Sequence, residues 1–382
     1  MLPLPGGFVV DPRRAPATFA AMLSLCQHGY EALLERELAE AGLVVGEKGS
    51  GWALCGSERA RDGAPGSQAS SLPQEIAVAD LAFPSLTLLA PREFRGESVN
   101  ALAQQLADFF LESLRGERID AAWPCVFLTV PEVVGLGRRA SGVEKAFGEL
   151  LKKKLARIAK LAELELPRTS GKVRGFFVFF ADFGRVYAAR EAWLGGQRRM
   201  ADDDAAPSRS YLKVEEAYLV LGREPQADET VVDLGAAPGG WSYSAAKRGA
   251  RVIAVDNGPL KGGALDHPLI EHRLEDAFKF APSSAPAAEG TPSAGVGFDW
   301  LFCDLVEEPH HVMRNLVTPW LSGGWCRRFV INLKFGHVDA LALLRELRAA
   351  DSPFVRHATN VRIRHLYHDR EEFTVVGETR PA

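Results

Sequence analysis

The chain has 382 residues, 47% of them hydrophobic and 25% charged, and its net charge is −4, which is ordinary for a soluble globular protein. This charge balance is not the overall basic footprint of a nucleic-acid binder. No apolar run approaches the roughly 18 residues of a membrane span, and residues 1–14 lack a signal pattern. Five scattered cysteines predict reduced core thiols, which favours a cytoplasmic protein over a secreted one or a zinc site.

The amino-terminal half alternates predicted strands with predicted helices. We expect strands over 23–26, 85–90, 126–130 and 173–180, and helices over 30–41, 98–114 and 144–162. Residues 57–75 are poor in apolar residues and are predicted to form a mobile loop.

Basic residues are concentrated in one stretch of this half. Residues 138–174 hold eleven lysines and arginines against four glutamates, with Lys152, Lys153 and Lys154 in succession. A solvated helix face would explain such a cluster by itself. Its density favours contacts with RNA phosphates instead.

The carboxyl-terminal half contains the most informative motif. An apolar run over 231–234 leads into a turn with Gly235, Gly239 and Gly240, as where the first strand of a doubly wound α/β sheet enters a nucleotide-type site. It is not the dinucleotide pattern G-x-G-x-x-G, which disfavours a nicotinamide dehydrogenase. A second apolar run ends at Asp256, whose carboxylate suits the two hydroxyls of a ribose. Together these features predict adenosine bound without a pyrophosphate, as S-adenosylmethionine presents it.

Further charged residues follow the later predicted strands. Asp276 could meet the adenine amino group, Asp304 ends an apolar run over 298–305, and Lys334 ends another over 328–334. Ligands of open α/β sheets bind beyond the carboxyl ends of the strands, so Asp304 and Lys334 are expected to converge over the cofactor. Each could alternatively be a solvated surface charge.

Two local signals complete this half. Ser210 is predicted to be the N-cap of a helix, with Lys213 in the first turn, where lysine opposes the helix dipole. His365, His368 and Asp369 invite a metal interpretation, but their spacing is not that of a metal-binding helix, and we expect no metal.

Residues 206 to about 376 resemble the ribose 2′-O-methyltransferases of bacterial ribosomal RNA. The likeness is greatest to the RlmM type, which methylates one cytidine of 23S ribosomal RNA. The resemblance is carried by long strings of residues, namely Ala206–Ser210 with Leu212–Lys213, Asp233–Ala236 with Pro238–Trp241, Val255–Pro259, Cys303–Asp304, Asn332–Lys334 and Leu366–Glu372. The departures are Ala237, where we expect cysteine, and a loop insertion at 281–297.

The resemblance implies a domain plan and partners. It implies a Rossmann-like methyltransferase domain over 207–378, a linker over 194–206, and an α+β RNA-binding region over 20–193 with a ferredoxin-like piece and a THUMP domain. S-adenosylmethionine is the implied cofactor. The implied partner is large-subunit ribosomal RNA, either free or in an early assembly intermediate.

The resemblance also assigns site residues. The family's Lys-Asp-Lys-Glu catalytic set falls on Lys213, Asp304, Lys334 and Glu372, although the motif does not decide between Glu372 and Glu371. The implied cofactor contacts are Ser210, Ala237, Pro238, Gly239, Gly240, Asp256, Asp276 and Asp304. These intact catalytic residues argue against an RNA-binding protein with a relic cofactor fold.

The residue types suit methylation of a ribose hydroxyl. The hydroxyl must be positioned for in-line attack and must lose its proton. A lysine can accept that proton if its pKa falls from about 10.4 towards roughly 7–8. Burial and the nearby Lys213 would lower the pKa of Lys334, whereas Asp304 and Glu372 would oppose the fall. We expect Lys334 to accept the proton, Lys213 and Glu372 to orient the reacting groups, and Asp304 to hold the methionine end of the cofactor.

Overall fold

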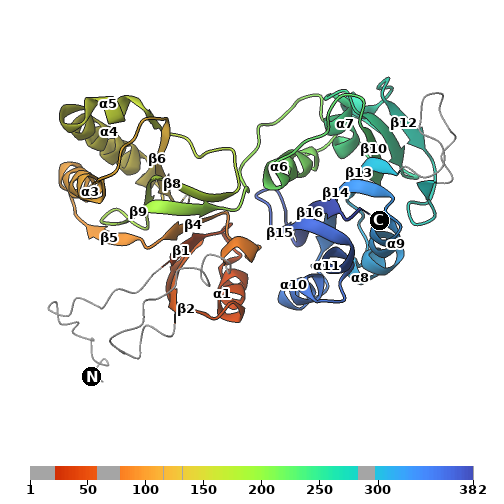
Figure 1. Ribbon diagram of the computed structural model, residues 1–382, viewed down its shortest axis with the longest axis horizontal. Coiled ribbons are helices and arrows are strands. Elements are labelled where there is room, and N and C mark those ends of the chain that lie inside the picture. The colour runs from red at the N-terminus through yellow and green to blue at the C-terminus, as the bar shows by residue number, and fades with distance from the viewer. Residues whose placement is uncertain (1–21, 58–77, 115, 131, 283–296, 382) are drawn as a thin grey trace, which may run out of the picture.

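A computed structural model describes residues 22–57, 78–114, 116–130, 132–282 and 297–381, which form two lobes (Figure 1). The loop predicted at 57–75 lies outside the described residues except Ser57, which ends a strand. The insertion predicted at 281–297 lies outside them except at its two ends.

The amino-terminal lobe is built on one nine-stranded sheet. Its main path is β2-β3-β1-β4-β9-β8-β6-β7, and β5 also pairs with β9. The strands are β1 (Met22–Leu25), β2 (Leu43–Gly49), β3 (Trp52–Ser57), β4 (Leu86–Leu89), β5 (Arg92–Arg95), β6 (Trp123–Thr129), β7 (Ala162–Glu163), β8 (Gly171–Phe180) and β9 (Arg185–Leu194). The helices are α1 (Glu31–Glu40), α3 (Val99–Ser113), α4 (Leu136–Lys154) and α5 (Ala156–Lys160).

The helix predicted over 144–162 differs from the observed one at both ends. It begins at Leu136, directly after Gly135, which has the left-handed φ of +86° that glycine tolerates. It breaks at Leu155, where φ is −144° and ψ is 63°, and α5 follows. Its buried face recurs every three or four residues, at Leu136, Ala140, Val143, Phe147 and Leu151. This spacing gives α4 one apolar face, which packs against α3 and the sheet.

The carboxyl-terminal lobe has a seven-stranded sheet in the order β12-β11-β10-β13-β14-β16-β15. Its strands are β10 (Thr230–Leu234), β11 (Arg251–Val255), β12 (Ile270–Arg273), β13 (Phe298–Cys303), β14 (Cys326–Lys334), β15 (Ala358–Arg364) and β16 (Glu372–Thr379). Its helices are α6 (Tyr211–Leu221), α7 (Gly240–Ala246), α8 (Pro309–Val312), α9 (Thr318–Ser322), α10 (Ala340–Arg348) and α11 (Pro353–His357), with a 3-10 turn at Gly262–Ala264 and a π-helix at Met313–Val317.

The pairing of these strands confirms the predicted doubly wound sheet. Strands β10 to β14 pair in parallel with one another, and β16 runs antiparallel between β14 and β15. The order of strands reverses between β10 and β13, and a ligand of such a sheet binds beyond the carboxyl ends of the strands at this switch point. Apolar side chains bury both faces, including Val231 and Trp300 on one and Val232 and Leu301 on the other.

The two lobes share a hydrophobic core. One continuous cluster of buried apolar side chains joins Leu34 and Leu38 of α1 and Phe83 to the carboxyl-terminal lobe. The rings of Phe83 and Phe373 lie 5.5 Å apart. Figure 1 places α1 beside α10, where Arg348 binds the buried Glu37 at 3.0 Å. The amino-terminal lobe therefore covers apolar surface of the other lobe.

All five cysteines are free and four of them are buried, in agreement with the prediction of core thiols. Burial raises the pKa of the Cys303 and Cys326 thiols to about 12. Among the described residues, no helix is long and apolar enough to cross a membrane.

Candidate active site

Strand pairing brings the expected catalytic lysine and glutamate together. In the antiparallel pair β14–β16, Lys334 lies opposite Glu372, and Asn332 lies opposite Thr374. Side chains two residues apart on a strand share a face, so these two cross-strand pairs lie side by side. The side chain of Glu372 is 5% exposed, whereas Glu371, the neighbour on the alternate face, is exposed to solvent. Geometry therefore selects Glu372 over Glu371.

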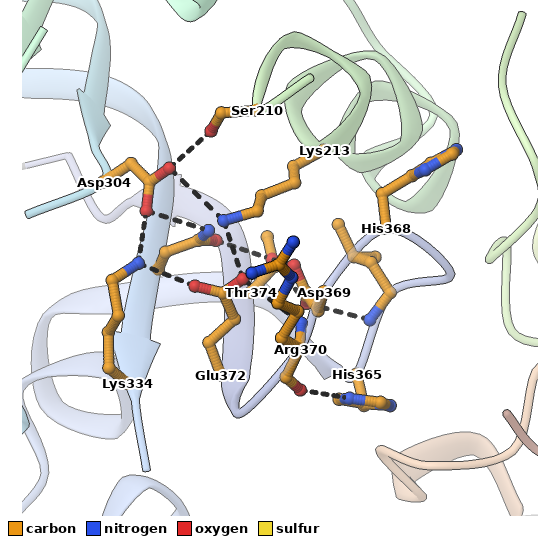
Figure 2. A network of polar contacts seen from close by, with 12 residues as sticks. Ser210, Lys213, Asp304, Lys334, His365, His368, Asp369, Arg370, Glu372 and Thr374 are labelled. Carbon is orange, nitrogen blue, oxygen red and sulfur yellow. Dashed lines mark hydrogen bonds and ion pairs between the residues drawn. The ribbon is translucent and has the colours of Figure 1, made fainter. Parts of the chain in front are cut away.

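Four charged side chains form a closed ring at the carboxyl ends of β13 and β14 (Figure 2). Lys334 Nζ lies 2.6 Å from Asp304 Oδ1 and 2.6 Å from Glu372 Oε2. Lys213 Nζ lies 2.6 Å from Glu372 Oε1 and 3.4 Å from Asp304 Oδ2. Each lysine contacts both carboxylates, so the ring alternates in sign and carries no net charge.

Burial and charge act in opposite directions on this ring. Burial raises the pKa of both carboxyl groups, but Lys213 and Lys334 outweigh it and lower the pKa of Asp304 to about 2. They lower the pKa of Glu372 as well. Burial lowers the pKa of Lys334, but Asp304 and Glu372 outweigh it and raise that pKa above its usual value.

The shift in the pKa of Lys334, which the residue types alone leave undecided, is therefore upward in this structure. Two carboxylates lie in direct contact with its ammonium group, and the second cation, Lys213, is neutralised by the same carboxylates. At these distances the attraction exceeds the cost of desolvating the ammonium group.

Ser210 stands at the start of α6 but does not cap it. Its φ of −58° and ψ of −26° are helical, and its side chain makes no capping hydrogen bond. The Oγ atom instead donates to Asp304 Oδ2 at 2.6 Å. Ser210 therefore occupies the predicted N-cap position, but the capping hydrogen bond is absent, because a cap needs extended backbone angles and those of Ser210 are helical. Lys213, in the first turn of α6, is likewise directed to the ring.

The glycine turn after β10 is packed closely against its own chain. Gly239 has a φ of +104°, and a Cβ there would lie 2.5 Å from the Cβ of Ala264. A Cβ on Gly240 would lie 3.0 Å from the amide nitrogen of Tyr211, at the start of α6. Any larger residue at these positions would displace the turn or the start of α6. The Pro238 carbonyl accepts from Lys261 N at 2.9 Å, which anchors the turn to the following loop.

The two expected adenosine contacts differ in how firmly they are held. Asp256, half-buried after β11, accepts from Ala237 N at 3.0 Å and from Gly258 N at 2.7 Å. Asp276 is 42% exposed, accepts from Phe278 N at 3.0 Å and pairs with Lys279 at 3.2 Å. Asp256 therefore ties together the turns after β10 and β11, whereas Asp276 lies at the surface.

The residues at these strand ends fit S-adenosylmethionine. Ser208 Oγ is buried without a hydrogen-bond partner among the described residues, and it lies 3.2 Å from where a Cβ on Gly240 would stand. A buried hydroxyl without a partner is costly unless a ligand supplies one. Asp256 offers carboxylate oxygens for a ribose, and Asp304 offers negative charge for a cationic amino acid group.

Sequence reasoning missed the polar residues behind the ring. Asn332 and Thr374 are each 1% exposed, and Asn332 Nδ2 donates to Asp304 Oδ1 at 3.3 Å. The sequence contained a signal for them. Asn332 lies two residues from Lys334, and Thr374 lies two residues from Glu372, so each shares a strand face with a residue of the ring.

The histidines considered for a metal are engaged elsewhere. His365 Nε2 donates to the Arg370 carbonyl at 2.7 Å, and His368 Nε2 accepts from Met200 N at 2.9 Å. Within the described part of the chain, no group of three or more His, Cys, Asp or Glu side chains could hold a metal ion.

Comparison with known proteins agrees with this geometry. Residues 206–341 match the family described as FtsJ-like methyltransferase. Several relatives are called ribosomal RNA large subunit methyltransferase M. The one from Laribacter hongkongensis is 37% identical over 63% of this chain and 66% of that protein. The one from Xanthomonas axonopodis pv. citri is 32% identical over 63% of this chain and 68% of that protein. The relative from Xanthomonas oryzae pv. oryzae is 29% identical over 94% of this chain and 99% of its own length.

Several of these alignments span less than two thirds of the relative, as with the 55% of the Marinomonas protein and the 66% of the Laribacter protein. Others span more, and the resemblance seen in the sequence is confirmed. The chain belongs to the ribosomal RNA large subunit methyltransferase M family.

Proposed function

We propose that this chain transfers a methyl group from S-adenosylmethionine to the ribose 2′-hydroxyl of a cytidine in 23S ribosomal RNA. The observation that carries the proposal is the closed ring of Lys213, Asp304, Lys334 and Glu372 beside an adenosine-type site at the ends of β10 and β11. The cofactor would be held by Ser210, Ala237 to Gly240, Asp256, Asp276 and Asp304. Family membership supports the same reaction.

The ring supplies the groups that this reaction needs. When bound, the cofactor supplies an electrophilic methyl group on a positively charged sulfur. The protein must therefore position the hydroxyl and accept its proton. Lys334 is the proposed acceptor, because the pKa of Asp304, about 2, makes that carboxylate a poor base. Any additional positive charge beside Asp304 weakens its attraction for Lys334 and lowers the pKa of that lysine.

The amino-terminal lobe is proposed to bind the RNA. Its first four strands pair antiparallel in the order β2-β3-β1-β4 with α1 between β1 and β2, which suits the ferredoxin-like piece. The THUMP domain would occupy the rest of 20–193. The linker would be 194–206 and the methyltransferase domain 207–378. In support, β9 ends at Leu194 and α6 begins at Tyr211.

Not all of the basic cluster is available to RNA. Lys152 pairs with Glu149 at 2.9 Å, and Lys154 pairs with Asp108 at 3.3 Å. Three exposed side chains of α4, Arg138, Lys145 and Lys153, make no ion pair within the described residues. They are the proposed phosphate contacts. The substrate would be free RNA or an early assembly intermediate.

The test is methyl transfer from labelled S-adenosylmethionine to transcripts of 23S ribosomal RNA, followed by mapping of the modified nucleotide. A single cytidine ribose should be methylated. Isothermal titration should show binding of S-adenosylmethionine and none of NAD. A methyl group on a base rather than on a ribose would overturn the proposal.

A further inference from the structure

A row of buried polar side chains lies directly behind the catalytic ring (Figure 2). Thr374 Oγ1 lies 2.6 Å from Asn332 Oδ1 and 2.9 Å from Asp369 Oδ2. Asn332 Nδ2 lies 3.3 Å from Asp304 Oδ1, which connects the row to the ring. Asp369, in the loop between β15 and β16, is 4% exposed and makes no ion pair within the described residues. Its Oδ2 atom accepts from Leu366 N at 2.9 Å.

The number of protons in this row decides the direction of each hydrogen bond. Asp304 is ionised, so Asn332 must turn its amide nitrogen toward that carboxylate and its oxygen toward Thr374. The amide oxygen can only accept, and the single hydroxyl proton of Thr374 must fill that bond. The contact between Thr374 and Asp369 then lacks a proton unless Asp369 carries one.

We propose that Asp369 is a neutral carboxylic acid in the folded protein and donates its proton to Thr374. The row then runs in one direction, from Asp369 through Thr374 and Asn332 to Asp304. Asp369 thereby becomes a positioning residue for the catalytic ring. The positioning role rests on the proposed methyl transfer, whereas the state of the proton does not.

The surroundings of Asp369 favour the proton. Burial and the neighbouring Glu372 raise the pKa of Asp369 well above its usual value, although Lys213 and the Leu366 amide oppose the rise. Glu216 on α6 also faces Asp369, as does Tyr30 before α1. Of the two adjacent carboxyls, Glu372 contacts both lysines and keeps its charge. Asp369 contacts neither and takes the proton.

Infrared spectroscopy tests the proton directly. The difference spectrum between the wild-type protein and Asp369→Asn at pH 7 should contain the carbonyl stretch of a protonated carboxylic acid. Other buried acids cancel in that difference. In Thr374→Val the band should move to higher frequency, because the acid loses its acceptor. Absence of the band would overturn the proposal.

The pH dependence of stability gives a second readout that does not require methyl transfer. A folded-state pKa raised above the unfolded value contributes stability that is present at low pH and lost as pH rises through the folded pKa. The wild-type protein should lose stability in this way, and Asp369→Asn should lack that loss. Equal pH dependence in the two proteins would contradict a neutral Asp369.

Methyl transfer tests the positioning role. An asparagine at position 369 can still accept from Leu366 N and donate to Thr374, so Asp369→Asn should keep the single-turnover rate within about 3-fold. Thr374→Val breaks the row and should lose about 3- to 10-fold with unchanged cofactor affinity, the range expected for one neutral hydrogen bond. Thr374→Ser should restore the rate. An Asp369→Asn rate as low as that of Thr374→Val would mean that the charged form is needed. If the wild-type protein transfers no methyl group, the proposed function fails. The infrared spectrum and the pH dependence of stability still show whether Asp369 is protonated.

Discussion

Replacement of Lys334 by methionine removes the proposed proton acceptor and keeps a side chain of similar length. A positioned general base contributes about 10²–10⁴-fold to a rate, so the single-turnover rate should fall by that factor. The corresponding rise in the barrier is about 3–5 kcal/mol. The assay is rapid mixing of enzyme, S-adenosylmethionine and an RNA fragment with excess enzyme. A Lys334→Met rate above one third of the wild-type rate would refute the assignment.

Lys213 provides a matched control, because it contacts the same two carboxylates and carries the same charge. Lys213→Met should also slow methyl transfer, but the reaction should keep its dependence on pH. In the wild-type protein, kcat/KM should rise about tenfold per pH unit from pH ~7 to ~9.5, because only deprotonated Lys334 can accept a proton and its pKa is raised. Lys334→Met should lose this slope. Retention of the slope in Lys334→Met would assign the proton to another group.

The structure also predicts what Lys334→Met leaves intact. Asp304 loses one cation, so a positively charged cofactor should bind at least as tightly as before. Glu372, with a side chain only 5% exposed, loses one of its two lysines, and the melting temperature should fall. The double variant Lys334→Met/Glu372→Gln removes one charge of each sign and should recover the melting temperature without recovering the rate. A recovered rate would mean that Lys334 acts only through charge balance.

Three further outcomes are expected. Asp256→Ala should weaken S-adenosylmethionine binding by about 1.5–3 kcal/mol in titration, which is the contribution of a hydrogen bond to a charged group. An unchanged affinity would mean that Asp256 only stabilises the turn. Glu372→Gln should slow methyl transfer at least tenfold. Glu371→Gln should not, because the side chain of Glu371 is exposed. Similar rates in the two variants would contradict the assignment by strand register. Lys153→Glu should weaken RNA binding and reduce the slope of log K against log salt by about 0.7–0.9. The control Lys48→Glu on β2 should change neither the affinity nor the slope. Equal effects of the two substitutions on RNA binding would place the RNA elsewhere.

The architecture of the carboxyl-terminal lobe could be predicted because its signals are local. The parallel strands β10, β11, β13 and β14 each contain an apolar run, and charged residues such as Asp256, Asp304 and Lys334 mark where strands end. Parallel strands place those ends on one edge, so convergence of the charges follows without knowledge of distances. The choice between Glu371 and Glu372 required the register of β16, which no local pattern supplies.

Other features depended on distances that the sequence does not contain. The pKa of Lys334 rises or falls according to whether two carboxylates touch it, and the residue types alone leave both outcomes open. Ser210 has the local pattern and the position of an N-cap, but its backbone is helical and its hydroxyl contacts an acceptor 94 residues away instead of the helix. The hairpin β2–β3 and the strand β9 were not predicted.

The contact between the lobes gives the amino-terminal region a structural role beside the ring. His365 N donates to the Ala82 carbonyl at 2.9 Å, and its ring lies 4.1 Å from that of Tyr30, so the amino-terminal lobe fixes this histidine. Its Nε2 atom in turn holds the Arg370 carbonyl, and the Arg370 amide donates to Glu372 Oε1 at 3.3 Å. The loop that precedes Glu372 is therefore supported from the other lobe. The lobe proposed to bind RNA therefore contacts the loop that precedes Glu372 through His365 and through Gln27, whose side chain donates to the Leu366 carbonyl.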